Sequence, residues 1–137
     1  MARFVDSSVI IRYLTDDIPQ RARIAEQILQ SDDLVVSCVI LSEVAYVLRS
    51  GYRYSRTQVL DALAQFLTLE NVELVGVPKE RVVSALAKAT HAPGLSFGDI
   101  LIIAQMRAAG YAEIYSFDSR FRDEGITVLE RPGTKEK

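Results

Sequence analysis

The chain has 137 residues, a length that fits one domain with a single hydrophobic core. Hydrophobic residues make up 49% of it and charged residues 25%, which excludes a disordered or collagen-like chain. The formal net charge of −2 excludes a protein that coats nucleic acid through a basic surface, although it does not exclude a nuclease.

The single cysteine, Cys38, cannot form a disulfide within the chain. This favours a reducing, cytoplasmic location and excludes a zinc site built on cysteines. Because His91 is the only histidine, a zinc site built on histidines is not expected either. No apolar run approaches the roughly 18 residues typical of a membrane span. We expect one domain over residues 1–132, followed by a flexible tail at residues 133–137.

The hydrophobic pattern predicts short strands that alternate with helices. The strands are expected at residues 3–5, 34–36, 72–75, 114–116 and 126–129. The helices are expected at residues 7–15, 19–30, 37–49, 55–67, 78–91 and 96–109, the last of them apolar almost all round and therefore buried. Strands separated by helices imply parallel crossovers. The predicted fold class is thus α/β, a three-layer α/β/α sandwich around a mostly parallel sheet of roughly five strands.

Four acidic residues fall where a predicted strand meets a helix or a turn. Asp6 ends the first strand, and Glu43 lies in the first two turns of the helix after the second strand. Asp99 lies in the first turn of the helix at 96–109, and Asp118 follows the strand at 114–116. Ligands of an open parallel sheet bind beyond the carboxyl ends of its strands, so all four acids can reach the same edge.

Each acid alone also has an ordinary structural explanation. Asp6 could cap the helix that follows it, Ser96 and Asp99 fit a capping box, and Asp118 could cap the turn after it. Glu43 differs because apolar residues flank it on both sides, so we expect it to be buried. A buried lone carboxylate is unstable unless it is paired or bound to a metal.

Several converging carboxylates require a cation or a shifted protonation state. Two of them ~4 Å apart repel by about 4 kcal/mol at an effective dielectric constant of about 20. Arg120 is the only Lys or Arg within the four acidic motifs, so a hard divalent ion with oxygen ligands is the simpler partner. Mg²⁺ fits such a site, and Mn²⁺ also suits these ligands.

The acids lie in four stretches that together resemble one family. The stretches read DSSVI at residues 6–10, LSEV at 41–44, FGDILIIA at 97–104 and SFDSRF at 116–121. In this order and spacing, and in a chain of this size, they resemble the PIN domain, and most closely the small VapC-type ribonuclease toxins of toxin–antitoxin systems. The resemblance extends from residue 3 to about residue 129.

This resemblance implies that Asp6, Glu43, Asp99 and Asp118 form an acidic quartet that binds Mg²⁺ or Mn²⁺ and hydrolyses RNA. It places the family's polar residue before the last acid at Ser116. It further implies an antitoxin whose C-terminal segment covers the site, and a homodimer. Where the family often has Asn two residues after the first acid, this chain has Ser8.

The resulting hypothesis is a metal-dependent endoribonuclease that hydrolyses RNA phosphodiester bonds. Asp6, Asp99 and Asp118 would hold one or two divalent ions, and Glu43 would complete the cage or orient the attacking water. Ser116 would hydrogen-bond a metal-binding carboxylate without contacting the metal itself. Ser8 is expected to have the same role.

Several bases and aromatics are weaker candidates for contact with RNA, because scattered surface charge is also ordinary. Those suited to phosphate are Arg12, Arg49, Arg53, Arg56 and Arg120, and those able to stack on bases are Tyr52 and Tyr54. The alternative function is a catalytically silent PIN-like module that binds RNA or protein. A response-regulator receiver domain is disfavoured, because no Asp follows the strand at 72–75.

Overall fold

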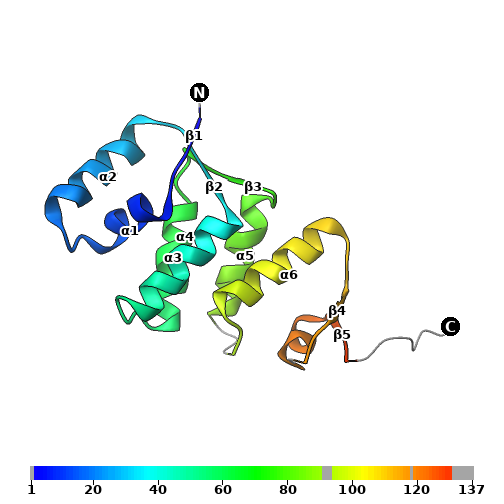
Figure 1. Cartoon of the computed structure of the whole chain (residues 1–137). Helices are drawn as coiled ribbons and strands as arrows, with labels where there is room; N and C mark the ends of the chain where they lie inside the picture. The colour runs from blue at the N-terminus through cyan, green and yellow to red at the C-terminus, as the bar shows by residue number, and fades with distance from the viewer. Residues whose placement is uncertain (1, 91–93, 118, 131–137) are drawn as a thin grey trace.

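A computed structural model of the chain describes residues 2–90, 94–117 and 119–130. Its strands are β1 (Arg3–Phe4), β2 (Leu34–Ser37), β3 (Val72–Val75), β4 (Glu113–Tyr115) and β5 (Thr127–Leu129). Its α-helices are α1 (Ser7–Thr15), α2 (Pro19–Ser31), α3 (Cys38–Ser50), α4 (Arg56–Leu67), α5 (Lys79–Ala89) and α6 (Phe97–Ala109). A 3₁₀ helix, η1 (Ser119–Glu124), lies between β4 and β5 (Figure 1).

Every strand pairing in the described part of the chain is parallel, which confirms the α/β class. One sheet has the order β1-β2-β3, with Arg3 opposite Leu34 and Leu34 opposite Val72. A second sheet pairs β4 with β5, with Glu113 opposite Thr127. Because the strands are parallel, β1 and β2 end at the same edge, where α1 and α3 begin.

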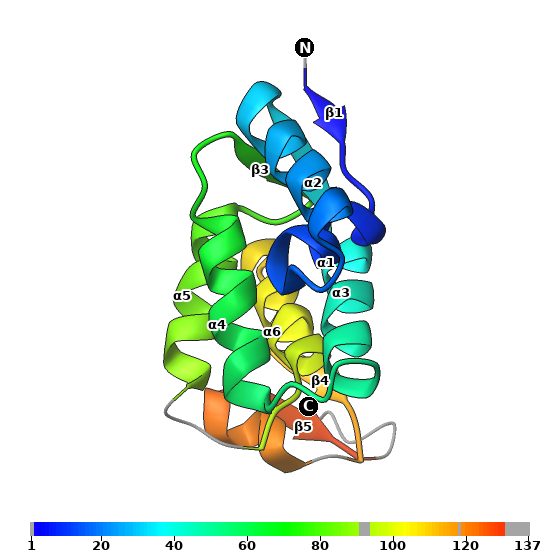
Figure 2. The ribbon, with the colours of Figure 1, turned by 90° about the vertical axis from the view of Figure 1, so that its left-hand side faces the viewer.

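The strands are divided between two sheets instead of forming one sheet of about five. Figures 1 and 2 show β4 and β5 at the opposite end of the molecule from β1. The physical reason lies in β1, which has only Arg3 and Phe4, both exposed. Its outer edge therefore offers few backbone groups to a further strand.

The helices begin where side-chain chemistry predicts helix N-termini. Four of them start at a side chain that accepts a backbone hydrogen bond, at Asp6, Ser37, Ser55 and Ser96. Ser55 and Gln58 form a capping box at the start of α4, and Pro19 opens α2. Gly110 ends α6 in the left-handed conformation, with φ of 86°.

The core lies among the helices and on the sheet that they cover. Helices α3, α4, α5 and α6 pack as neighbours, and α1 packs between α2 and α3 (Figure 2). The largest fully buried side chains include Phe66, Leu63, Leu48, Leu41 and Ile10. Burial of each such side chain contributes about 1.5–3 kcal/mol relative to exposure. These helices hold the sheet edge on which the candidate site depends.

Helix α6 is less buried than its sequence suggested. Ile100, Leu101 and Ile103 are buried, but Ile102 is 40% exposed and Gln105 is exposed. The reason is that α5 and α3 cover only part of its circumference.

Across the described ranges, no helix combines the length and apolarity needed to cross a membrane. The tail expected at residues 133–137 lies outside the described residues.

Candidate functional site

Asp6 is placed directly after β1 and caps α1. Its Oδ2 accepts hydrogen bonds from the Ser8 hydroxyl at 3.0 Å and from the Ser8 backbone N–H at 3.5 Å. The Ser8 hydroxyl, followed by the backbone N–H groups of Ser7 and Ser8, holds the pKa of Asp6 below its ordinary value. The side chain is exposed, so it is an ionised carboxylate open to solvent near neutral pH. Capping and availability to a ligand coexist here, because the carboxylate that caps the helix is exposed.

Asp99 is fixed by the first turn of α6. The Ser96 N–H donates to Asp99 Oδ2 at 3.1 Å, and the Asp99 N–H donates to Ser96 Oγ at 3.1 Å. This is the capping box that the sequence predicts. Asp99 is half-buried, and its Oδ1 receives no hydrogen bond from any described residue. One carboxylate oxygen therefore orients the side chain while the other stays available.

Glu43 is exposed, so the expectation that it is buried is wrong. It shares a helical face with Val39 and Tyr46, which are 78% and 71% exposed. Helix α3 turns Leu41 and Val44 into the core instead. Among the apolar neighbours that suggested burial, Leu41, Val44 and Ala45 are buried, but Glu43 lies on the exposed face with Val39, so its carboxylate needs no partner to be stable.

The convergence of the four acids stays a prediction. Asp118 lies outside the described residues, as does His91. Among the residues that the structure describes, no three His, Cys, Asp or Glu side chains are grouped so that they could hold a metal ion. Ser116 follows β4, and its N–H donates to the Leu129 carbonyl at 3.0 Å. This bond ties the start of the last acidic motif to the β4–β5 sheet.

The available donors fit a hard divalent ion by their chemistry. Asp99 keeps one carboxylate oxygen without a hydrogen bond from the described residues, and the carboxylates of Asp6 and Asp99 are the kind of oxygen ligand that Mg²⁺ and Mn²⁺ prefer. Both acids stand in the first turn of a helix or just before it, where a negative charge is stabilised by the helix dipole.

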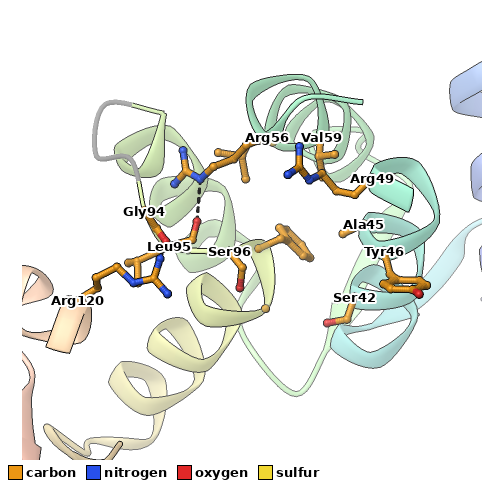
Figure 3. A pocket seen from close by; sticks show the side chains of 13 residues that line it. Ser42, Ala45, Tyr46, Arg49, Arg56, Val59, Gly94, Leu95, Ser96 and Arg120 are labelled. Carbon is orange, nitrogen blue, oxygen red and sulfur yellow. Dashed lines mark hydrogen bonds between the residues drawn. The ribbon is translucent and has the colours of Figure 1, made fainter. Parts of the chain in front are cut away.

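A cavity of about 450 Å³ lies between α3, the start of α4 and the start of α6 (Figure 3). The described residues that line it are Ser42, Ala45, Tyr46, Arg49, Arg56, Val59, Leu60, Gly94, Leu95, Ser96, Phe97, Gly98 and Arg120. Glu43 directly follows Ser42 in the chain, and Asp99 directly follows Gly98. The sequence suggested each of the three arginines separately as a contact for RNA. It did not indicate that they share a cavity, because they come from α3, α4 and η1.

Two candidates for RNA contact are engaged in the fold. Arg12 Nη1 donates to Asp17 Oδ1 at 3.1 Å and to the Tyr52 hydroxyl oxygen at 3.0 Å. The Tyr52 hydroxyl donates to Asp17 Oδ2 at 2.7 Å, and Tyr52 contacts Tyr54 edge to face. This network joins the end of α1 to the segment between α3 and α4. Arg12 and Tyr52 therefore have a structural role, whereas Arg53 is exposed in that segment with φ of 58°.

Comparison with known proteins gives the family. The sequence model of the PIN domain matches residues 3–125, which include all four acids. The chain belongs to the PIN domain family. Among solved structures, it is similar to Mycobacterium tuberculosis VapC20, described as a toxin that cleaves the sarcin–ricin loop. That likeness has 23% sequence identity and a TM-score of 0.42 and covers 91% of this chain and 96% of that one. A search of curated proteins finds no match.

Proposed function

We propose that this PIN-domain chain is a metal-dependent endoribonuclease that hydrolyses phosphodiester bonds of RNA. The observation that carries the proposal is the position of the acids within the matched region. Asp6 and Asp99 stand at helix N-termini, Asp6 exposed and Asp99 with Oδ1 free of hydrogen bonds from the described residues, and Glu43 lies on the helix that follows β2. Asp118 lies within the matched residues 3–125, and its SFDSRF motif supports including it in the proposed set.

Asp6, Asp99 and Asp118 would hold Mg²⁺ or Mn²⁺, and Glu43 would complete the cage or orient the attacking water. When bound, such an ion supplies Lewis-acid stabilisation of the negative charge that develops on the phosphate. The Ser8 hydroxyl donates to Asp6 and lowers its pKa, and the Ser96 N–H holds the Asp99 carboxylate in place. Ser116 is proposed to support Asp118 in the same way.

Cleavage of a mixed RNA by the purified chain tests this proposal. We expect cleavage with Mg²⁺ or Mn²⁺ and none with a chelator. Asp6→Asn and Asp99→Asn should abolish it, because the amide carries no charge with which to hold the ion. Asp61→Asn, a change at an exposed acid on α4, is the matched control and should cleave as the wild type does. Equal cleavage by Asp99→Asn and the wild type would refute the proposal.

We further propose that the chain is the toxin of a toxin–antitoxin pair, inhibited by a cognate antitoxin and assembled as a homodimer. Support comes from the four motifs and their resemblance to VapC-type toxins. Expression without a partner should arrest growth, and the Asp99→Asn variant should relieve the arrest. Normal growth with abundant active enzyme would contradict the toxin role and leave the nuclease intact. Sedimentation of the pure chain tests the dimer.

One observation favours a second candidate, a silent PIN module that binds RNA or protein. Within the described ranges the acids form no group able to hold a metal. The chelator experiment separates the two functions, because a silent module binds RNA to the same extent with and without metal and releases no fragments.

A further inference from the structure

The cavity between α3, α4 and α6 combines an apolar floor with a cationic rim. Its floor contains Val59, Leu60, Leu95 and Phe97, all of which are buried. Its volume of about 450 Å³ lies in the range of small-ligand sites, about 300–1,000 Å³. A floor of this kind accepts a flat apolar group and gives it no polar partner.

Three arginines surround the cavity, and none of the described residues that line it is acidic. Two of the guanidinium groups are anchored to the wall: Arg56 Nε donates to the Leu95 carbonyl at 2.7 Å, and Arg120 Nη1 donates to the Gly94 carbonyl (Figure 3). Arg49 Nη1 donates to the Tyr54 carbonyl at 2.9 Å and is otherwise exposed. The positive charge is thus held at the cavity mouth before any ligand arrives, which favours an anion.

Tyr46 adds an aromatic surface to the same cavity. It is 71% exposed although it lines the cavity, so its ring is not used by the core. Exposed aromatic rings stack on nucleic-acid bases, and arginine forks bind phosphate in two parallel hydrogen bonds. A nucleotide contains both of these groups.

We propose that this cavity binds one nucleotide of the RNA substrate, with its base against Tyr46 and the apolar floor and its phosphate on the arginines. The proposal rests on the proposed ribonuclease function and names a subsite for it. Because Ser42 and Gly98 line the cavity and precede Glu43 and Asp99, the bound nucleotide would neighbour the bond that is cut.

A peptide fits the cavity less well than a nucleotide. An extended peptide binds through backbone hydrogen bonds. Two wall carbonyls that could supply them, those of Gly94 and Leu95, already accept from Arg120 and Arg56. The positive charge of the three arginines also favours a nucleotide, because every nucleotide has an ionised phosphate whatever its base.

The test is titration of the full chain with each of the four nucleoside 5′-monophosphates in a chelator, followed by calorimetry and by NMR shifts of the cavity amides. We expect millimolar or tighter binding that moves the amides of residues 94–98. Arg49→Gln should weaken it by about 10- to 100-fold, since a charge-assisted contact is lost. Arg23→Gln, at an exposed arginine on α2, is the matched control and should bind as the wild type does.

Tyr46→Ala keeps the test independent of folding, because the side chain is exposed and its removal leaves the core intact. It should weaken the binding of the nucleotides by about 5- to 100-fold through lost stacking. In RNA cleavage, both cavity variants should raise KM more than they lower kcat.

Three results would overturn the subsite. They are no binding of any monophosphate at millimolar concentration, equal binding by wild type and Arg49→Gln, and preferential binding of an acidic peptide. A failure of the nuclease proposal can be distinguished from a failure of the subsite proposal. If monophosphates bind through Arg49 but RNA is never cut, only the nuclease fails, and if RNA is cut with unchanged KM in both variants, only the subsite fails.

Discussion

Ser96 and Asp99 bond each other in both directions at the start of α6. The Ser96 N–H donates to Asp99 Oδ2, and the Asp99 N–H donates to Ser96 Oγ, each at 3.1 Å. The same carboxylate is one that we propose to hold the metal. Capping would not compete with the metal for Asp99, because it occupies Oδ2 and leaves Oδ1 without a hydrogen bond from the described residues.

Removal of this cap should affect activity as well as stability. Ser96→Ala loses the hydroxyl that accepts from Asp99, and the helix should be destabilised by about 1 kcal/mol. We expect RNA cleavage to fall with it, because Asp99 is no longer held in one rotation. Urea denaturation and a cleavage assay with Mg²⁺ measure the two effects.

Ser55→Ala is the matched control, since Ser55 and Gln58 form an equivalent capping box on α4. It should reduce the free energy of unfolding by a similar amount and leave cleavage unchanged. Equal losses of activity in both variants would indicate that Ser96 acts through stability alone.

Asp99→Asn should abolish cleavage and preserve the fold. The Asn side-chain oxygen can still accept from the Ser96 N–H, so the capping geometry survives. We expect the free energy of unfolding to change by less than about 1 kcal/mol, which is the typical value of a whole cap. Loss of folded protein, measured by circular dichroism, would make the lost activity uninformative, and Asp6→Asn then serves as the second variant.

The Ser8 hydroxyl should lower the pH at which Asp6 loses its charge. It is the main cause of the lowered pKa of Asp6, so Ser8→Ala should raise that pKa toward its ordinary value of 3.8. The ionised form of Asp6 would then be lost at a higher pH as the solution is acidified. An NMR titration of the Asp6 carboxyl carbon measures this change directly. Ser8→Thr keeps a hydroxyl and is the control, and an unchanged Asp6 pKa in Ser8→Ala would disprove the assignment.

The Tyr52–Asp17 contact predicts an acid-sensitive part of the stability. The Tyr52 hydroxyl is the largest cause of the lowered pKa of Asp17. A carboxyl group whose pKa is lower in the folded chain than in the unfolded chain stabilises the fold at pH values above its unfolded pKa. This contribution is lost as the pH falls through the folded pKa. The window therefore lies below pH 3.8, the ordinary value. Tyr52→Phe should raise the Asp17 pKa and weaken the loss of stability in this window.

Tyr54→Phe is the control for that experiment, because no hydrogen bond of the Tyr54 hydroxyl to a described residue is present. The Asp17 pKa should stay at the wild-type value in this variant. If Tyr54→Phe moves the pKa as far as Tyr52→Phe does, the hydrogen bond at 2.7 Å is not the cause.

The sequence predicted the elements well because their signals are local. Asp6, Ser55 and Ser96 mark helix starts through their own side chains, and Gly110 marks a helix end through its backbone freedom. The helix at residues 7–15 and the strand at 72–75 have the observed bounds. Each of these predictions depends on residues only a few positions apart.

Relations between distant segments were less predictable. Glu43 was expected inside because of its neighbours along the chain, but which face of α3 is buried depends on what packs against it. The division of the strands into two sheets depends on whether β1 offers a long enough edge. The shared cavity of Arg49, Arg56 and Arg120 likewise depends on the approach of α3, α4 and η1. The four acids were predicted from all four motifs together, and their convergence stays a prediction.

Binding of Mn²⁺ to the purified chain, measured by calorimetry, tests the central claim most directly. We predict saturable binding by the wild type and by the control Asp61→Asn, and its loss in Asp99→Asn. If folded Asp99→Asn binds Mn²⁺ with the same affinity as the wild type, the result would contradict the claim that Asp99 helps to hold the ion on which RNA cleavage depends.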